Sequence, residues 1–422
     1  MAFHRVLASL LAVPLLAVAD PAAPPSFDGL LVAEGARLAA IGNCASCHTA
    51  VEGKAYAGGY PLKTPFGTIY GTNITPDRDT GIGTWTEAQF RRALREGIDD
   101  EGRHLYPAFP YDHFTRLSDA DISALYAYLM TREPVAARTP ANDLRFPFNF
   151  RPLIGLWKIF FFDAGTFRPD PEKSAQWNRG AYLVEGLGHC GACHTPRNFL
   201  GAEVKRKLLD GGEAEGWYAP ALTGANPAPV PWTEEQLFRY LRTGLEERHA
   251  IAAGPMQPVV RNLAAVSEED VRAIAAYLAK FAGPPSLERQ KRAQDAISLA
   301  ERERTLSAPA PESGGAAVYA AACATCHAQG RDASSGASLP LSLGTAMTVP
   351  TSANLVRITL EGIQPPTGES GRWMPAFANL LTDEQTRDLM VYIRAQYGGG
   401  APPWRDIDEQ IKGTREAMKG EK

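Results

Sequence analysis

The sequence predicts an all-α fold in which three similar helical units follow one another, joined by Pro-rich linkers. Three observations lead to this prediction. The pattern Cys-x-x-Cys-His occurs at residues 44–48, 190–194 and 323–327, and these copies use all 6 cysteines of the 422-residue chain. Apolar residues recur at helical spacing around each copy. The order of helix start and stop signals is repeated three times, which is the sign of an internal repeat.

The Cys-x-x-Cys-His pattern is typical of covalent haem attachment. Its two thiols can add to the vinyl groups of haem, and the histidine that follows can bind the iron. Disulfides, a zinc site or a thioredoxin-like redox pair would give no reason for three trailing histidines or three scattered copies. We therefore predict three covalently bound haem c groups, attached at Cys44, Cys47, Cys190, Cys193, Cys323 and Cys326, with His48, His194 and His327 as iron ligands.

Each predicted unit contains three principal helices. The first leads into the haem motif, at residues 32–43, 177–188 and 316–322. The second ends at a glycine, as expected of a helix C-cap, at Gly97, Gly244 and Gly362. The third starts at Ser118, Ser267 and Thr382, each followed by acidic residues that suit a helix N-terminus. The expected haem domains cover residues 27–133, 169–282 and 313–398.

Linkers, a tail and a leader complete the predicted organisation. Residues 134–168 and 283–312 are the linkers, the second with a charged helical run at 287–304, and residues 399–422 form the tail. Residues 1–19 have a polar start, an apolar run and a small-residue cleavage site, which predicts a secretory signal peptide, with an uncleaved anchor as the alternative. Because c-type haem is attached outside the cytoplasm, we expect a periplasmic protein, peripherally associated with the cytoplasmic membrane.

Charge and hydropathy restrict the partners. The net charge of -4 and the pI near 6.1 argue against nucleic acid. No stretch after the leader is long and apolar enough for a transmembrane helix. The apolar run at residues 154–162 is unusual for a linker. It is either buried between units or docks on a partner subunit or the membrane interface.

An electron-carrying haem needs a second axial ligand, which in c-type cytochromes is usually Met or His. The loop before the third helix supplies Met256 in the second unit and Met374 in the third. Both lie in Pro-rich polar loops, where filling a core, the usual role of a buried Met, is less expected. Met347 is a weaker candidate in the third unit.

The first unit departs from this pattern because its loop has Phe109 where a Met is expected. Phe cannot bind iron. We favour His113 as the ligand, and the alternatives are His104, Met130 and an open site. Ligation by two histidines would make this haem the low-potential one, because Met ligation raises the potential. His189 and His249 are expected to be surface or loop residues.

The mature chain resembles the triheme cytochrome c subunits of bacterial membrane-associated dehydrogenases, such as those of alcohol, gluconate, sorbitol and aldehyde dehydrogenases. The segments that carry the resemblance are residues 64–77 (TPFGTIYGTNITPD), 80–85 (TGIGTW), 105–108 (LYPA) and 179–185 (RGAYLVE). Alcohol dehydrogenase cytochromes of this family carry Met at the position of Phe109. With Phe109, His113 and residues 216–222 and 253–256, the chain looks more like the branch that accompanies molybdenum hydroxylases of aldehydes or N-heteroaromatics.

The resemblance implies an electron-transfer subunit without catalytic residues of its own. Its donor would be a catalytic dehydrogenase subunit, either a molybdenum hydroxylase with an Fe-S subunit or a quinoprotein or flavoprotein. Its acceptor would be ubiquinone or a terminal oxidase. The protein would set the spacing and potential of the haems, while the haems carry the redox chemistry. Two alternatives remain: a peroxidase-like enzyme with an open haem in the first unit, and a free periplasmic shuttle.

Overall fold

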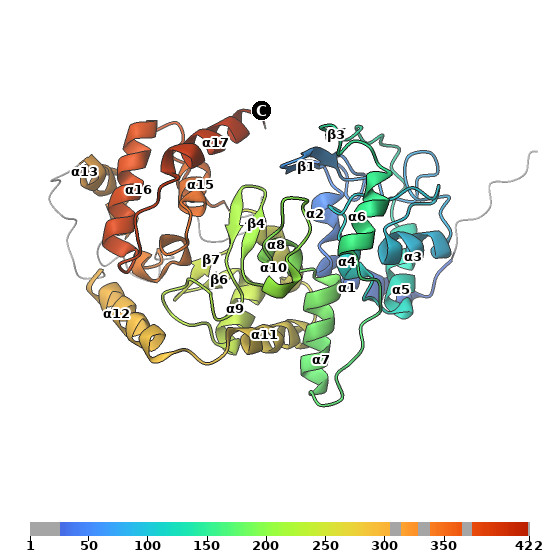
Figure 1. Cartoon of the computed structure of the whole chain (residues 1–422), viewed down its shortest axis with the longest axis horizontal. Coiled ribbons are helices and arrows are strands. Elements are labelled where there is room, and N and C mark those ends of the chain that lie inside the picture. Colours follow the sequence, from blue (N-terminus) through green and yellow to red (C-terminus); the bar gives the residue numbers. More distant parts are fainter. Residues whose placement is uncertain (1–25, 304–313, 328–337, 365–373, 421–422) are drawn as a thin grey trace, which may run out of the picture.

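The computed structural model describes residues 26–303, 314–327, 338–364 and 374–420, and this part of the chain is largely helical (Figure 1). The predicted signal peptide and part of the second predicted linker lie outside the described residues. We call the segments around the three Cys-x-x-Cys-His copies the first, second and third units. The second unit lies between the other two in Figure 1, with the first toward the blue end of the colour scale and the third toward the red end.

The first unit and the linker that follows it share one three-stranded sheet in addition to their helices. The elements in chain order are α1 (Gly29–Ile41), α2 (Cys44–Cys47), β1 (Pro61–Thr64), β2 (Gly67–Tyr70), α3 (Glu87–Glu96), α4 (Tyr111–Phe114), α5 (Asp119–Met130), β3 (Asp143–Leu144) and α6 (Leu153–Phe161). Strands β1, β2 and β3 form one antiparallel sheet in that order, with Thr68 opposite both Lys63 and Asp143. The linker is thereby fixed to the first unit.

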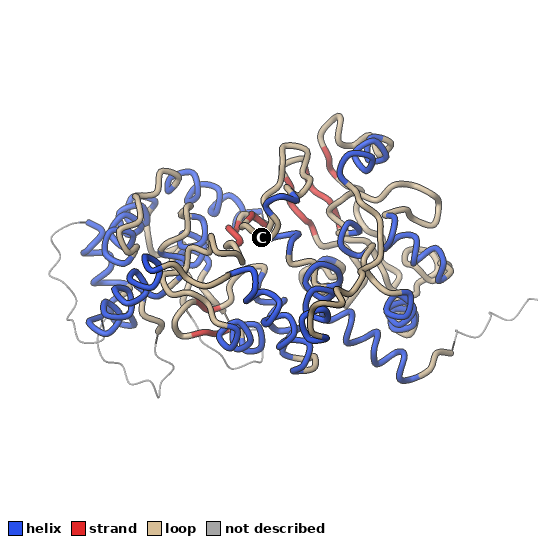
Figure 2. The backbone as a smooth tube through the Cα atoms, turned by 60° about the horizontal axis from the view of Figure 1, so that its bottom comes forward, coloured by secondary structure: helices blue, strands red, loops and turns tan. Residues whose placement is uncertain are grey.

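The second unit repeats this order with small additions. Its elements are α7 (Ala175–Tyr182), the π-helical turn η1 (Leu183–Leu187), α8 (Gly191–His194), the 3-10 turn η2 (Lys205–Lys207), β4 (Gly212–Ala214), β5 (Trp217–Ala219), α9 (Glu234–Thr243), β6 (Leu245–Glu246), β7 (Ala250–Ile251), α10 (Met256–Ala264) and α11 (Glu268–Ala282). The strands form two separate two-stranded antiparallel sheets. Figure 2 shows how little of the backbone they occupy.

The third unit follows the charged helix α12 (Leu287–Glu303), which the sequence predicts at 287–304. Its elements are α13 (Gly314–Ala322), α14 (Ala324–His327), the 3-10 turns η4 (Leu341–Leu343) and η5 (Thr345–Met347), α15 (Ala353–Glu361), α16 (Asp383–Tyr397) and α17 (Ile407–Gly420). Helix α17 lies in the predicted tail, where the sequence analysis expects no element. It packs against α15 and α16, so residues 407–420 are part of the third unit's packing.

In each unit the helix before the haem motif (α1, α7 or α13) crosses a later helix (α5, α11 or α16) closely at a glycine. A Cβ atom on Gly35 of α1 would lie 1.9 Å from the carbonyl oxygen of Ala124 in α5. The corresponding distances are 2.1 Å from Gly180 to the oxygen of Ala273, and 2.3 Å from Gly315 to the oxygen of Asp388. Such contacts exclude any side chain. The same crossing therefore occurs three times, in agreement with the predicted repeat.

The predicted helix ends are confirmed. The side chains of Ser118, Ser267 and Thr382 accept hydrogen bonds from backbone N–H groups at the starts of α5, α11 and α16. Gly97 and Gly244 end α3 and α9 in the left-handed conformation, with φ of 61° and 72°. Local sequence chemistry therefore sets these boundaries.

The hydrophobic core divides between the units unequally. One buried cluster runs through the first and second units together, including Leu38 and Leu125 from the first and Leu183 and Val271 from the second. A separate cluster around Leu360 and Leu389 belongs to the third unit. The first two units therefore share a large apolar core. A smaller cluster, which includes Val230 of the second unit and Leu343 of the third, joins those two units through α12, and polar contacts connect them as well. Among these contacts, the Tyr218 N–H donates to Asn354 at 2.8 Å.

Candidate cofactor site

All three Cys-x-x-Cys-His copies open onto one continuous cavity of about 3030 Å³. Pockets for a single small ligand usually measure roughly 300–1,000 Å³. The lining is mostly apolar and includes all six cysteines together with His48, His194 and His327. A cavity of this size, with thiols in three places along it, fits several large flat cofactors held within one protein.

The histidines of the first two motifs are oriented for iron binding. Nδ1 of His48 lies 2.7 Å from the carbonyl oxygen of Thr72, and Nδ1 of His194 lies 2.7 Å from that of Pro220. An N–H at Nδ1 that donates to a carbonyl leaves the Nε2 lone pair free for a metal. Burial lowers the pKa of both imidazoles and of His327, which favours the neutral form that binds iron.

The thiols of the first two motifs lie in surroundings that oppose their ionisation. All six are free. Burial raises the pKa of Cys44 and Cys190 to about 12, so both thiols stay protonated at neutral pH. Disulfide exchange and zinc binding both need a thiolate. The thiol environment therefore agrees with attachment of haem rather than with the rival uses of Cys-x-x-Cys.

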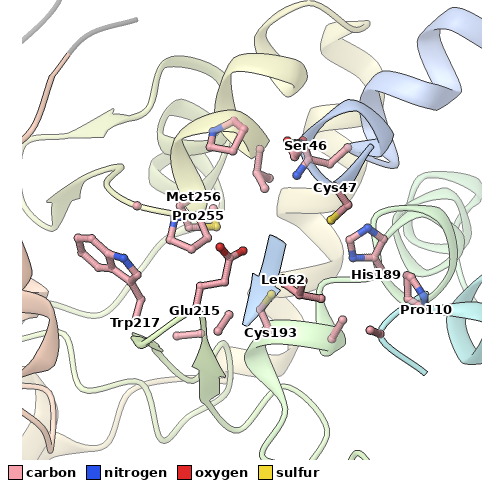
Figure 3. Close-up of a pocket in the computed structure, with 18 of the residues that line it drawn as sticks. Ser46, Cys47, Leu62, Pro110, His189, Cys193, Glu215, Trp217, Pro255 and Met256 are labelled. Atoms are coloured by element: carbon pink, nitrogen blue, oxygen red, sulfur yellow. Dashed lines mark hydrogen bonds between the residues drawn. The ribbon is translucent and has the colours of Figure 1, made fainter. Parts of the chain in front are cut away.

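The first and second motifs face each other across the cavity. Figure 3 shows Cys47 and Cys193 on opposite sides of the same space, with Glu215 to one side of both and Met256 near Glu215. Burial and the charge of Glu215 raise the pKa of both thiols, and the proximity of Cys193 raises the pKa of Cys47 further. The hydroxyl of Tyr60 in the first unit donates to Glu215 in the second. Cofactors attached here would therefore lie close together, as electron transfer between them requires.

The proposed methionine ligands line the cavity. Met256 is the first residue of α10, and Met374 pairs by backbone hydrogen bonds with Ile363 beyond the end of α15. Both contribute to the cavity wall, as do Phe109 and the weaker candidate Met347. The iron-ligand roles of Met256 and Met374 remain predictions, and their positions on the wall are those that the roles require.

His113, the predicted iron ligand of the first unit, is hydrogen-bonded to the second unit and does not line the cavity among the described residues. Its Nδ1 lies 2.9 Å from the carbonyl oxygen of Glu185, and its Nε2 lies 2.8 Å from Oε1 of Glu203, both in the second unit. Both ring nitrogens are therefore engaged, and the side chain is absent from the cavity lining among the described residues. The position of His113 does not support the prediction that it binds iron.

The alternative ligands of the first unit are also placed away from the cavity. Nδ1 of His104 lies 3.1 Å from Nζ of Lys158, a residue of α6. Met130 is the last residue of α5 and packs against the apolar core of the first two units. Neither residue lines the cavity within the described ranges.

His189 and His249, which were expected to be surface or loop residues, both lie in loops or turns, and His249 is buried while His189 is partly buried. His249 is fully buried and stacks on Trp232 with ring centroids 3.7 Å apart. His189 packs against Phe114, with its Nε2 3.2 Å from the carbonyl oxygen of Gly42. Burial lowers the pKa of His189 to about 4 and that of His249 to about 3, so both rings are neutral. Both line the cavity, a position that no local sequence signal indicates.

Helix α6, which forms the apolar run of the first linker, is exposed rather than buried between units. Ile159, Phe160 and Leu156 are 77%, 70% and 53% exposed. The one charged residue of the helix, Lys158, points inward, with its Nζ 2.8 Å from the carbonyl oxygen of Gly97. The cation thus lies inside the protein and the exposed side chains are apolar. Leu156 and Phe160 lie at the cavity wall, whereas Ile159, among the described residues, does not line the cavity.

Three Cys-x-x-Cys-His motifs on a shared, mostly apolar cavity, with the imidazoles of the first two oriented for a metal, define a c-type cytochrome. Comparison with known proteins also identifies the chain as a cytochrome c. Residues 32–133 match the family model described as cytochrome c, and residues 310–393 match that of cytochrome C oxidase, cbb3-type, subunit III. The cysteine pairs at 44/47, 190/193 and 323/326 are consistent with three haems.

Similar proteins extend over nearly the whole chain. The fructose dehydrogenase cytochrome subunit of Gluconobacter japonicus is 38% identical, with 89% of this chain and 81% of that protein covered. The cytochrome c subunit of alcohol dehydrogenase (quinone) of Gluconobacter oxydans is 37% identical, with 93% and 84% covered. A nicotinate dehydrogenase subunit of Pseudomonas putida is 46% identical over 409 residues, with 96% of this chain but 34% of that protein covered.

The chain therefore belongs to the family of cytochrome c subunits of dehydrogenase complexes. It is an electron-transfer subunit, and substrate oxidation takes place on a partner subunit. The chain spans about a third of the length of the Pseudomonas putida nicotinate dehydrogenase subunit. The family resemblance given by the sequence motifs is confirmed.

Proposed function

We propose that this protein carries three haem c groups in three cytochrome c-like domains and relays electrons from a molybdenum hydroxylase to the respiratory chain. The observation that supports an electron relay is that all three haem motifs open onto a single cavity. Electrons can pass along it from haem to haem without leaving the protein. The haems supply the one-electron chemistry, while the chain supplies attachment, iron ligands and spacing.

The chain's own residues would hold the haems as follows. The cysteine pairs attach them, and His48, His194 and His327 bind the irons from one side. Met256 and Met374 would bind the second and third irons from the other side, because both lie on the cavity wall ahead of the closing helix of their units. Trp232 and His249, stacked and buried, would form part of the wall beside the second haem.

The donor is proposed to be a molybdenum hydroxylase that oxidises an aldehyde or an N-heteroaromatic compound. Two observations support this partner over a quinoprotein or flavoprotein. The first is Phe109 in the ligand loop, which resembles the branch that accompanies such hydroxylases. The second is the 46% identity to a nicotinate dehydrogenase subunit, higher than the 37% and 38% to the alcohol and fructose dehydrogenase subunits.

Metal analysis of the native complex tests the donor. The complex would be purified from solubilised membranes by following the haem absorbance of this chain. We expect molybdenum to co-purify with haem iron. Finding a quinone cofactor or a flavin in place of molybdenum would contradict the proposed donor and assign the chain to an alcohol or sugar dehydrogenase. Finding haem iron alone, with no catalytic subunit, would favour a free periplasmic shuttle.

The acceptor is proposed to be ubiquinone or a terminal oxidase, reached from the periplasmic surface of the membrane. Within residues 26–303, 314–327, 338–364 and 374–420, no helix is long and apolar enough to cross a bilayer. Contact with the membrane through these residues would therefore be at its surface. Helix α6 suits such contact, because protruding aromatic and aliphatic side chains enter a lipid interface without needing a shaped partner.

Substitution of an exposed side chain of α6 that does not line the cavity tests the membrane contact. We expect Ile159→Ser to weaken sedimentation with phospholipid vesicles by at least roughly tenfold, because a buried apolar side chain contributes about 1.5–3 kcal/mol. Leu287→Ser, which changes a residue 83% exposed on α12, is the matched control and should have no effect. Unchanged vesicle binding combined with loss of the catalytic subunit would show that α6 contacts the partner instead.

A further inference from the structure

We infer that the first haem has no protein side chain at the sixth position of its iron, and that this position binds small neutral ligands such as carbon monoxide. The inference rests on the proposed attachment of three haems. It goes beyond that proposal by assigning a ligand-binding site to one of them. Four observations support it, namely the spacing of the repeat, the cavity wall, the engagement of the nearby histidines and the apolar surroundings.

Counting along the repeat places Phe109 at the ligand position. Phe109, Met256 and Met374 each come twelve residues after the glycine that ends the second helix of the unit, at Gly97, Gly244 and Gly362. The first unit therefore has a phenyl ring, which has no atom that can bind iron, where the other two units have a thioether. The three residues are therefore equivalent by sequence register.

Backbone hydrogen bonds confirm this equivalence for the first two units. The N–H of Leu105 donates to the oxygen of Gly97 at 2.8 Å, and the N–H of Ala252 donates to the oxygen of Gly244 at 2.8 Å. Phe109 comes four residues after Leu105, and Met256 comes four residues after Ala252. The chain is anchored to the end of the second helix in the same way in both units, which supports the equivalence of Phe109 and Met256, and both side chains line the cavity.

The phenyl ring faces the cavity but offers the iron no lone pair. Phe109 lines the cavity and packs edge to face on Phe114, with ring centroids 5.4 Å apart. Among the residues of the first unit that the structure describes, His48 is the one histidine or methionine on the cavity wall. His113 and His104 are hydrogen-bonded elsewhere, at 2.8 Å to Glu203 and 3.1 Å to Lys158.

His189 is the remaining nitrogen donor near this haem, and one of its ring nitrogens, Nε2, is engaged. Nε2 of His189 lies 3.2 Å from the carbonyl oxygen of Gly42, two residues before Cys44. The ring is therefore held at the start of the first haem motif, with Phe114 beside it. It is not in the loop position that the methionines occupy in the other units.

The apolar surroundings of Phe109 determine which small molecules can bind to the iron of the first haem. Phe109 packs against a buried apolar cluster that includes Phe90, Leu94 and Phe114. An anion would lose its hydration there without gaining hydrogen bonds, which carries a large free-energy cost. A small neutral molecule such as carbon monoxide or nitric oxide avoids this cost. Binding to the reduced haem is therefore expected to be stronger for these molecules than for cyanide or azide.

Carbon monoxide titration of the reduced, full-length holoprotein tests the inference. We expect the wild-type protein to bind one carbon monoxide per three haems. Phe109→Met supplies the missing thioether and should reduce binding to near zero, with the ferric spectrum becoming fully low-spin. Met256→Phe makes the second unit resemble the first and should raise binding from one to two. Phe167→Met is the control, because Phe167 packs on Tyr182 away from the cavity, and should leave binding at one.

Two results would overturn the inference. One is a wild-type protein with three low-spin haems that binds no carbon monoxide. The other is binding that is unchanged in both Phe109→Met and Met256→Phe, provided that each variant retains three haems per chain. Either result would leave the electron-transfer proposal intact, because that proposal is tested by the metal content of the complex and by reduction of the haems by the catalytic partner.

Discussion

Replacing Cys190 and Cys193 with Ser is expected to reduce the haem content from three per chain to two and to bring electron transfer from donor to acceptor close to zero. Serine cannot form the thioether bonds that attach haem. The second unit lies between the other two (Figure 1), and its thiol Cys193 faces Cys47 of the first motif across the cavity. Loss of the middle haem therefore interrupts the relay at its centre.

Haem content would be measured from the absorbance of the denatured haem, and electron transfer from the reduction of a quinone by the intact complex. Circular dichroism would show whether the helices of the second unit persist without their cofactor. Cys323→Ser with Cys326→Ser is the matched control, since it also leaves two haems but keeps the first two units connected. Full quinone reduction by the Cys190/Cys193 variant would contradict a relay through the second haem.

The features that could be predicted from the sequence are those set by nearby residues. The haem motifs, the caps at Ser118, Ser267 and Thr382, and the terminating Gly97 and Gly244 all follow local chemistry, and the structure confirms the caps and the helix ends. The register of the repeat also follows from spacing alone. These local signals were sufficient to indicate the family.

The remaining features depend on residues far apart in the chain. Strand β3 of the linker was missed because it pairs with β2, some seventy residues earlier. Helix α17 was missed because its apolar residues are buried only against α15 and α16. The burial of His249 depends on stacking with Trp232. The exposure of α6 depends on Lys158 finding carbonyl partners in the first unit.

His113 is the clearest example of a long-range partner changing the interpretation of a residue. Its position in the ligand loop of the first unit favours iron binding when only the sequence is considered. The structure pairs it with Glu203, ninety residues later, with the two side chains 8% and 10% exposed. Nothing in the local sequence around His113 indicates Glu203, so the prediction could not have included this partner.

Replacing Glu203 with Gln is expected to destabilise the junction of the first and second units by about 3–5 kcal/mol at pH 6, because it leaves a buried histidine cation without its carboxylate. Burial alone would lower the pKa of His113, but Glu203, Asp112 and the Glu185 carbonyl raise it to about 9. Burial opposes ionisation of Glu203 as well, yet His113 and Arg197 keep its pKa below the ordinary value of 4.5.

The pH dependence follows from these two shifts. The contribution of His113 is complete below its ordinary pKa of 6.5 and is lost as the pH rises through about 9. The contribution of Glu203 is present above 4.5 and is lost as the pH falls below that value. The effect of Glu203→Gln should therefore be largest between about pH 4.5 and 6.5 and small at pH 10. Denaturation midpoints measured by haem absorbance across this range would check it.

His113→Gln separates the structural role of His113 from the predicted ligand role. If His113 only pairs with Glu203, this variant should lose stability with the same pH dependence as Glu203→Gln, and the two substitutions together should cost little more than either alone. The spin state and carbon monoxide binding of the first haem should stay as in the wild type. A change from low-spin to high-spin iron in His113→Gln, with no change in Glu203→Gln, would show that His113 binds the iron in the holoprotein.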